Sequence, residues 1–390
     1  MAVLSVIGET LPDFEHALNE AVVRQLTEAL GATAPKGCSV NLIVGRHSAA
    51  ERFANPRIST EKIGLTAKMM PVVWQASAAA RPMDGSLMHA VTALAPLRSR
   101  HDDQEAQTTV TVQHLLPWSA PHLYPASQLR LIRNFIRRAV KHADVIVTPN
   151  YATAEALQEQ FGDVNAQVQP FAPLPELVAE QSAAAGVDHA ARRAALDVPE
   201  RYLLTTADVS ETGRLQWLAD AVTADRELPP VVVVGAFREG SAELSDAGER
   251  SDTGERAAAG EKTDALTRLA RDSDGQVVVI HPTDLYDLGA LISGAEALVL
   301  PQAAHTAGHE AMAALANAVP VFHAEAPEVH EIVVDAGVTF DSAETLHTAL
   351  AETLNDAQRL EQLKVLADDR AGFFSWRSLA WAIWELHAEI

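Results

Sequence analysis

Cysteine is almost absent from this sequence of 390 residues, in which Cys38 is the only one. A single cysteine excludes an internal disulfide and a zinc site built from several thiolates. Long apolar runs are missing too, because no segment approaches the ~18 apolar residues that a membrane-spanning helix needs. The opening stretch, MAVLSVIGETLPD, also lacks the basic lead and the cleavable apolar segment of a secretory signal. These absences predict a cytoplasmic protein, and they leave open a position at the inner face of a membrane.

Positive charge is scarce as well. The chain has 30 lysines and arginines against 52 aspartates and glutamates, a formal net charge of -22. Such a surface repels phosphate backbones, so nucleic acid is not an expected partner. The apolar fraction of 48% over this length is enough to build two cores of ordinary domain size.

Short β-rich runs alternate with stretches of helical periodicity along most of the chain. This alternation is typical of parallel α/β sheets. The predicted strands are AVLSVI, CSVNLIV, TTVTVQ, ADVIVT, YLLTT, PVVVVG, QVVVI, EALVL and VPVF.

The series breaks once, in a proline- and alanine-rich stretch without a predicted strand, and this break predicts two domains. We expect an N-terminal Rossmann-like domain over 1–172, a linker over 173–199 and a C-terminal Rossmann-like domain over 200–375. Residues 238–263 are rich in Gly, Ser and alternating charge, and we expect them to form a mobile surface insertion. The tail 376–390 carries apolar residues at helical spacing, among them Trp376, Leu379, Ile383 and Trp384, and predicts an amphipathic helix.

Specific motifs add a resemblance to a known family. The stretch DLYDLGALISGAEALVLPQAAHTAGHEAMAALANAVPVFHAEAPEVHEIVVDAG, followed later by FFSW, resembles the donor domain of family 4 glycosyltransferases, which are retaining nucleotide-sugar enzymes. In the first half, SLMHAVTALAPLRSR, TVTVQHLLPWSAP and HADVIVTPNYATAEAL resemble the family's acceptor-side elements. These motif sequences are similar to those of actinobacterial mannosyltransferase-like members.

The resemblance implies a GT-B fold, with two Rossmann-like domains facing across a cleft and a C-terminal helix that crosses back to the first domain. It also implies a nucleotide-diphosphate sugar as donor substrate, with no separate cofactor and no metal. A glycan or lipid-linked acceptor would be the second substrate.

The family's phosphate-binding cations are missing from their expected place. In the family an Arg-Lys pair follows the first strand of the donor domain and faces the diphosphate, and this pair corresponds here to Thr212 and Gly213. Arg214 is the nearest replacement, although one position along a helix turns a side chain by roughly 100 degrees. A relocated phosphate ligand and a solvated helix residue both remain open for Arg214.

The family's two sugar- and ribose-binding carboxylates are missing too, since His305 and Ala313 take their positions. A carboxylate accepts two hydroxyl hydrogen bonds at once, which alanine cannot do. Glu310 lies three residues earlier on the same helix face and is a candidate substitute. Gly308 belongs to the same loop and is a donor-binding candidate or a scaffold residue.

On the acceptor side, the family's His-Asp pair corresponds to Gln113 and His114. His89 occurs where the resembling members also carry histidine. These three residues are the candidates for a catalytic role. His114 could contact a sugar if its loop shifts by one place, and for His89 a position lining the cleft remains open.

Two functions therefore remain open. One is a non-catalytic glycosyltransferase homologue that acts as a partner or regulatory subunit, including as a homo-oligomer. The other is an active hexosyltransferase, mannosyl by resemblance, with a donor site rebuilt from Arg214, His305 and Glu310. A basic amphipathic helix in LRLIRNFIRRAVKHA fits either a solvated surface or contact with an anionic membrane.

Overall fold

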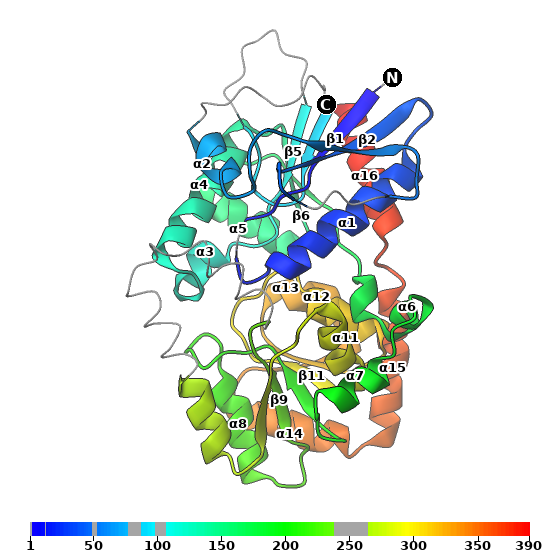
Figure 1. Ribbon diagram of the computed structural model, residues 1–390. Helices are drawn as coiled ribbons and strands as arrows, with labels where there is room; N and C mark the ends of the chain where they lie inside the picture. Colours follow the sequence, from blue (N-terminus) through cyan, green and yellow to red (C-terminus); the bar gives the residue numbers. More distant parts are fainter. Residues whose placement is uncertain (1, 12, 49–52, 77–86, 98–106, 238–263) are drawn as a thin grey trace. The chain divides into compact units, whose positions relative to one another are not determined.

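The computed structural model describes residues 2–11, 13–48, 53–76, 87–97, 107–237 and 264–390. These residues form two compact units (Figure 1). Unit 1 comprises Met1–Ala172 together with Ser375–Ile390, and unit 2 comprises Pro173–Phe374. The insertion expected at 238–263 lies outside the described residues.

Unit 1 is built on a seven-stranded sheet in the order β3-β2-β1-β4-β5-β6-β7, and every neighbouring pair in it is parallel. The order runs outward in both directions from β1 and β4, so these two strands mark the topological switch point. The strands are β1 (Ala2–Ile7), β2 (Cys38–Val44), β3 (Ile58–Lys62), β4 (Leu87–Ala90), β5 (Gln107–Thr111), β6 (Val145–Thr148) and β7 (Ala166–Val168).

The C-terminal helix belongs to unit 1. This helix, α16 (Trp376–Glu389), packs beside α1 (His16–Thr33), and the indole of Trp384 donates to the Leu30 carbonyl at 3.1 Å (Figure 1). The predicted amphipathic tail is therefore confirmed. The other helices of the unit are α2 (Met70–Gln75), α3 (Leu116–Ser119), η1 (Pro121–Leu123), α4 (Ala126–His142) and α5 (Tyr151–Phe161).

Unit 2 contains a six-stranded parallel sheet in the order β10-β9-β8-β11-β12-β13. Its switch point lies between β8 and β11. The strands are β8 (Leu203–Thr205), β9 (Val231–Val234), β10 (Val277–Ile280), β11 (Ala297–Leu300), β12 (Val321–Ala324) and β13 (Gly337–Phe340).

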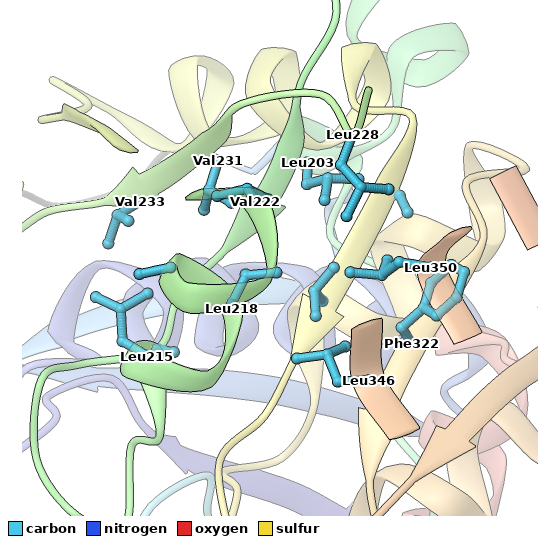
Figure 2. Packing of buried hydrophobic residues seen from close by; sticks show 14 of the residues in the cluster. Leu203, Leu215, Leu218, Val222, Leu228, Val231, Val233, Phe322, Leu346 and Leu350 are labelled. Carbon is cyan, nitrogen blue, oxygen red and sulfur yellow. The ribbon is translucent and has the colours of Figure 1, made fainter. Parts of the chain in front are cut away.

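One core cluster of unit 2 lies where helices cover this sheet (Figure 2). Leu215, Leu218 and Val222 recur at helical spacing on α8 (Leu215–Ala224), and all three are fully buried. They pack with the valines of β9, a β-branched run that suits a strand covered on both faces. The remaining helical elements are α11 (Leu285–Gly294), α12 (His309–Ala316), α13 (Pro327–Val333), η3 (Val334–Ala336), α14 (Ala343–Leu354) and α15 (Ala357–Ala371).

Residues 173–199, which the sequence assigns to a linker, form η2 (Pro175–Leu177), α6 (Ala179–Ala184) and α7 (His189–Ala195) within unit 2. All three pack against α11. Gly289 of α11 permits this packing, because a Cβ there would collide with the carbonyl of Glu176 and the backbone of Leu177.

All nine predicted strands are present, and four further strands escaped prediction. The four are short or polar: β3 reads ISTEK at the sheet edge, β7 is only AQV, and β4 and β13 have four residues each. Segments of this kind carry too few apolar residues to show a period. Among the described residues, no helix is long and apolar enough to span a membrane.

Candidate functional site

The loops that follow β8 and β11 meet at the switch point of unit 2, where open α/β sheets bind ligands. The amide of Ala303 donates to the Thr212 carbonyl at 2.9 Å, and the side-chain amide of Gln302 donates to Thr206 at 3.2 Å. The fold thus brings together the two segments that carry the predicted donor-binding residues. Their local geometry decides what each residue can do.

Asp208 holds the loop after β8 together through hydrogen bonds of its side chain and its backbone. Its carboxylate accepts from the Ser210 amide at 2.6 Å, and its carbonyl accepts from the Leu215 amide at 3.2 Å. Gly213 lies against both groups, so a Cβ at that position would collide with the Asp208 carboxylate and carbonyl. Any residue larger than glycine at 213 would therefore need Asp208 to move.

Arg214 supplies a positive charge to the N-terminus of α8, but its guanidinium lies along its own helix. Its carbon Cζ is 4.6 Å from the centroid of the Trp217 ring, a cation–π arrangement. The residue adopts φ 54, which is unusual for a side chain other than glycine, and it gives α8 no side-chain cap.

His305 is buried in the loop after β11, where its Nε2 lies 3.1 Å from the Gln302 carbonyl. Burial is the main cause that lowers the pKa of His305 to about 4, and nearby His323 lowers it further. The ring is neutral near pH 7, so it cannot replace the missing phosphate-binding charge.

The residues around α12 differ in their access to solvent. Gly308 precedes the helix with φ 76, and a Cβ there would collide with Ile332. Glu310 is partly exposed on the first turn, whereas Ala313 is fully buried in the core. Of these two positions, only Glu310 presents a carboxylate to solvent.

In unit 1, His89 lies inside the sheet. It is fully buried on β4, and its Nδ1 is 2.8 Å from the Thr109 hydroxyl, which in turn is 3.2 Å from Nε2 of His387 on α16. Burial, and secondarily His387, lowers the pKa of His89 to about 3. Gln113 is also buried, and its side chain donates to the Val91 carbonyl at 3.1 Å.

His114 belongs to an acidic cluster that the sequence did not reveal. Its Nε2 is 2.9 Å from Glu15, a buried carboxylate at the start of α1, and Asp13 lies beside them. Burial first, and then the charge of Glu15, raises the pKa of Asp13 to about 7. Burial first, and then the charges of Glu15 and Asp13, raise the pKa of the Tyr124 hydroxyl.

A cavity of about 40 Å³ adjoins this cluster and is lined by Asp13, Asn19, Gln113 and His114, among others. This volume holds about one water-sized group. The amide oxygen of Asn19 and the hydroxyl of Tyr124 are buried without a hydrogen-bond partner among the described residues. The cluster is therefore a second candidate site, suited to a single hydroxyl or water.

The only sequence signal for the cluster was the pair of carboxylates in DFE after the first strand. The sequence could not show that His114 joins these carboxylates, because Glu15 and His114 are 99 positions apart. Within the described residues, no group of three or more His, Cys, Asp or Glu side chains is placed to hold a metal ion.

No sequence-family profile matches the chain, and no curated protein matches it in sequence. Solved structures match in fold over essentially the whole length. Sucrose-phosphate synthase from Thermosynechococcus elongatus aligns with a TM-score of 0.70 and 18% identity, covering 100% of this chain and 99% of that one. HepE from Anabaena in complex with UDP-glucose gives a TM-score of 0.66 at 15% identity, with 100% of both chains covered.

WaaG, a glycosyltransferase involved in lipopolysaccharide biosynthesis, aligns with a TM-score of 0.63 and 12% identity over 98% of this chain and 99% of that one. The structural neighbours are GT-B glycosyltransferases, so the expected fold class is confirmed. At these identities the likeness establishes the fold alone, and the residues must decide the function.

Proposed function

We propose that this protein is a non-catalytic homologue of the family 4 GT-B glycosyltransferases and acts as a partner or regulatory subunit in glycan synthesis. One observation carries the proposal: Asp208 lies so close to Gly213 that the Cβ of any larger residue, a cationic one included, would collide with its carboxylate and carbonyl. Around it, Arg214 stacks on Trp217 and His305 is neutral. Arg214 is thus the one cationic side chain among the donor-site candidates, and its guanidinium lies over the Trp217 ring of its own helix.

The energetic consequence is large. Removing one preorganised donor to a developing negative charge slows a reaction by about 100- to 1000-fold. Here two cations and two carboxylates of the family's motif are replaced together. Even with strong non-additivity, an unchanged mechanism would lose several orders of magnitude in rate.

A thermal-shift panel tests this proposal. The purified protein is heated with UDP, GDP, UDP-glucose or GDP-mannose at millimolar concentration, with HepE and UDP-glucose as the positive control. A ligand present at 100 times its Kd adds about 2.7 kcal/mol to the stability of the folded state. We expect no rise in melting temperature for this protein, and a clear rise with one nucleotide would contradict the empty donor site.

The second candidate is an active retaining hexosyltransferase, mannosyl by resemblance, with a rebuilt donor site. Two helix N-termini favour it, because neither α8 nor α12 has a side-chain cap and the N-terminus of a helix carries partial positive charge. This candidate requires hexose transfer by the wild type and a 100-fold or greater loss in Arg214→Ala. Arg268→Ala, at an exposed arginine of the same unit, is the control.

For both candidate functions, the non-catalytic homologue and the active transferase, we propose that the partner is a protein or a lipid-linked glycan at the membrane face. Support comes from α4, where Arg130, Arg137 and Lys141 are exposed, while Arg133 and Arg138 donate inward to backbone carbonyls. Sedimentation with phosphatidylglycerol vesicles should be lost when the three exposed cations become glutamine. Equal sedimentation of the triple variant would contradict membrane contact.

A further inference from the structure

The cavity of about 40 Å³ in unit 1 lies at the topological switch point of its sheet, between β1 and β4. Its walls come from the loops that follow β1, β4 and β5, from Asn19 of α1, and from Ile132 and Ile136 of α4. Ligands of open α/β sheets bind at the carboxyl ends of the strands that flank a switch point. The fold therefore favours a ligand at this position.

The charged groups at the cavity are mostly acidic. The Asp13 carboxylate accepts from the Glu15 amide at 3.1 Å, and the buried Glu15 carboxylate lies 2.9 Å from Nε2 of His114. Among the residues that the structure describes, neither a lysine nor an arginine lines the cavity. Arg133, which follows Ile132 on α4, donates to the Pro117 carbonyl at 2.6 Å instead. One histidine thus faces two carboxyl groups.

Two buried polar atoms beside these carboxyl groups have no hydrogen-bond partner among the described residues. One is Oδ1 of Asn19, a residue that is 4% exposed and lines the cavity, and the other is the hydroxyl of Tyr124. The side-chain amide of Asn19 bonds to Asp13, which leaves its carbonyl oxygen as the free acceptor. Because buried polar atoms in folded proteins are nearly always bonded, this oxygen indicates a ligand that carries a donor.

The local charge decides which donor fits. Burial first, and then the charge of Glu15, raises the pKa of Asp13 to about 7, so a proton neutralises this carboxyl in mildly acidic solution. A cation beside Asp13 would favour the ionised form and displace that proton. Water or a neutral hydroxyl would satisfy Asn19 but leave the charge uncompensated. An ammonium group does both, since it brings three N–H donors and one positive charge.

The surroundings suit an organic cation. Leu11, Ile132 and Ile136 form an apolar part of the wall. The side chain of Phe14 is 50% exposed directly after Asp13, and its ring centroid lies 5.3 Å from that of Tyr124. Aromatic faces attract ammonium ions. Apolar and aromatic side chains beside a carboxylate therefore match a carbon chain that ends in an ammonium group.

We infer that this cavity binds the ammonium group of a small primary amine, with the Asp13 carboxylate and the Asn19 carbonyl as its acceptors. An ammonium nitrogen is about the size of a water molecule, which the volume accommodates. The alkyl part lies against Leu11 and the two isoleucines of α4. Binding moves one proton from Asp13 to solvent, while the amine keeps its own three. All these residues belong to unit 1, so the inference depends on neither the donor loops nor the proposed function.

Calorimetric titration with methylammonium chloride tests this site. At pH 6, in two buffers of different ionisation enthalpy, we expect saturable binding with release of about one proton per amine. Binding should strengthen about tenfold from pH 5 to pH 6 and level off above pH 7, because the proton on Asp13 competes with the amine. The other titratable groups that face Asp13 are Glu15, His114 and Tyr124, and Asp13→Asn separates its proton from theirs.

Methanol and potassium chloride are the matched control ligands. Methanol has the size of methylammonium without its charge, and potassium has the charge without N–H donors. Neither should bind with comparable affinity. Equal binding of methanol would make the cavity a hydroxyl or water site, and equal binding of potassium would make it a general cation site. Either result, or no saturable heat with methylammonium below about 100 mM, would overturn the inference.

Variants assign the two acceptors. Asp13→Asn keeps the shape of the side chain and should weaken methylammonium at least about tenfold, with no proton released. Asn19→Leu removes the carbonyl at similar volume and should also weaken binding. Asp163→Asn, the same change at an exposed aspartate of unit 1, should bind like the wild type. Circular dichroism confirms that each variant is folded, and wild-type affinity in both Asp13→Asn and Asn19→Leu would contradict the site.

Discussion

At the scale of single residues, the most informative position is Gly213, because placing a cation there should destabilise the protein. Gly213→Lys forces a Cβ into the Asp208 carboxylate and carbonyl. Overpacking of this kind costs about 1–3 kcal/mol. We expect a lower melting temperature and no gain in nucleotide binding, both measured by thermal shift.

The matched control is Gly372→Lys. That glycine also lies in unit 2, and its nearest contact for a new Cβ is an ordinary 3.4 Å from the Asp369 carbonyl. It should melt within a degree or two of the wild type. Equal melting of both variants would show that Asp208 moves aside easily.

Asp13 should impose a pH dependence of its own on unit 1. Its folded pKa is about 7, above the ordinary 3.8, so the folded state holds a proton that the unfolded state has released. Its contribution to stability is therefore fully present below about pH 4 and is lost as pH rises to about 7. Asp13→Asn should stabilise the protein at pH 8 by roughly 1–3 kcal/mol, after allowance for solvent screening.

Urea unfolding at pH 5 and pH 8 measures this effect as the difference between the variant and the wild type. The difference should grow towards pH 8. A constant difference across that range would mean that Asp13 is ionised throughout in the folded state.

At the scale of elements, α16 tests how unit 1 depends on the end of the chain. Trp384 is buried against α1 and donates to the Leu30 carbonyl, whereas Trp381 on the same helix is 44% exposed. Trp384→Ala should cost about 3–5 kcal/mol, since it removes a large buried side chain. Trp381→Ala should cost less than about 1 kcal/mol.

Urea unfolding followed by far-ultraviolet circular dichroism measures both tryptophan variants on the full chain. Similar losses from the two substitutions would mean that α16 is not held by its buried face. The comparison is internal to one helix, so differences in helix propensity cancel.

At the scale of the whole molecule, buried histidines should set the acid limit of stability. His89, His387 and His305 have pKa values lowered to about 3, 4 and 4, chiefly by burial. Their unfolded forms take up protons below about pH 6.5 while the folded forms stay neutral, so stability is lost as pH falls from about 6.5 to 4. The loss should be on the order of 1 kcal/mol per histidine for each pH unit.

This acid effect has the opposite sign to that of Asp13. His305→Asn in unit 2 should flatten the loss between pH 6.5 and pH 4, as measured by urea unfolding at closely spaced pH values. An unchanged slope in this variant would show that His305 is accessible to protons in the folded state.

The sequence by itself determined the fold class. Valine-rich runs such as PVVVVG separated by helical periods are typical of covered parallel strands, and all nine predicted strands are present. The sequence also determined that Thr212, Gly213 and Ala313 carry neither a cation nor a carboxylate, since residue identity requires no coordinates.

Only the tertiary structure decided what those positions can do. The closure of Gly213 by Asp208, the stacking of Arg214 on Trp217 and the neutrality of His305 all depend on packing and desolvation, which no local pattern encodes. The pairing of Glu15 with His114 joins segments that are 99 positions apart. Strand order decides which distant residues become neighbours, and burial then decides their protonation state. Neighbourhood and protonation state are therefore properties of the folded chain.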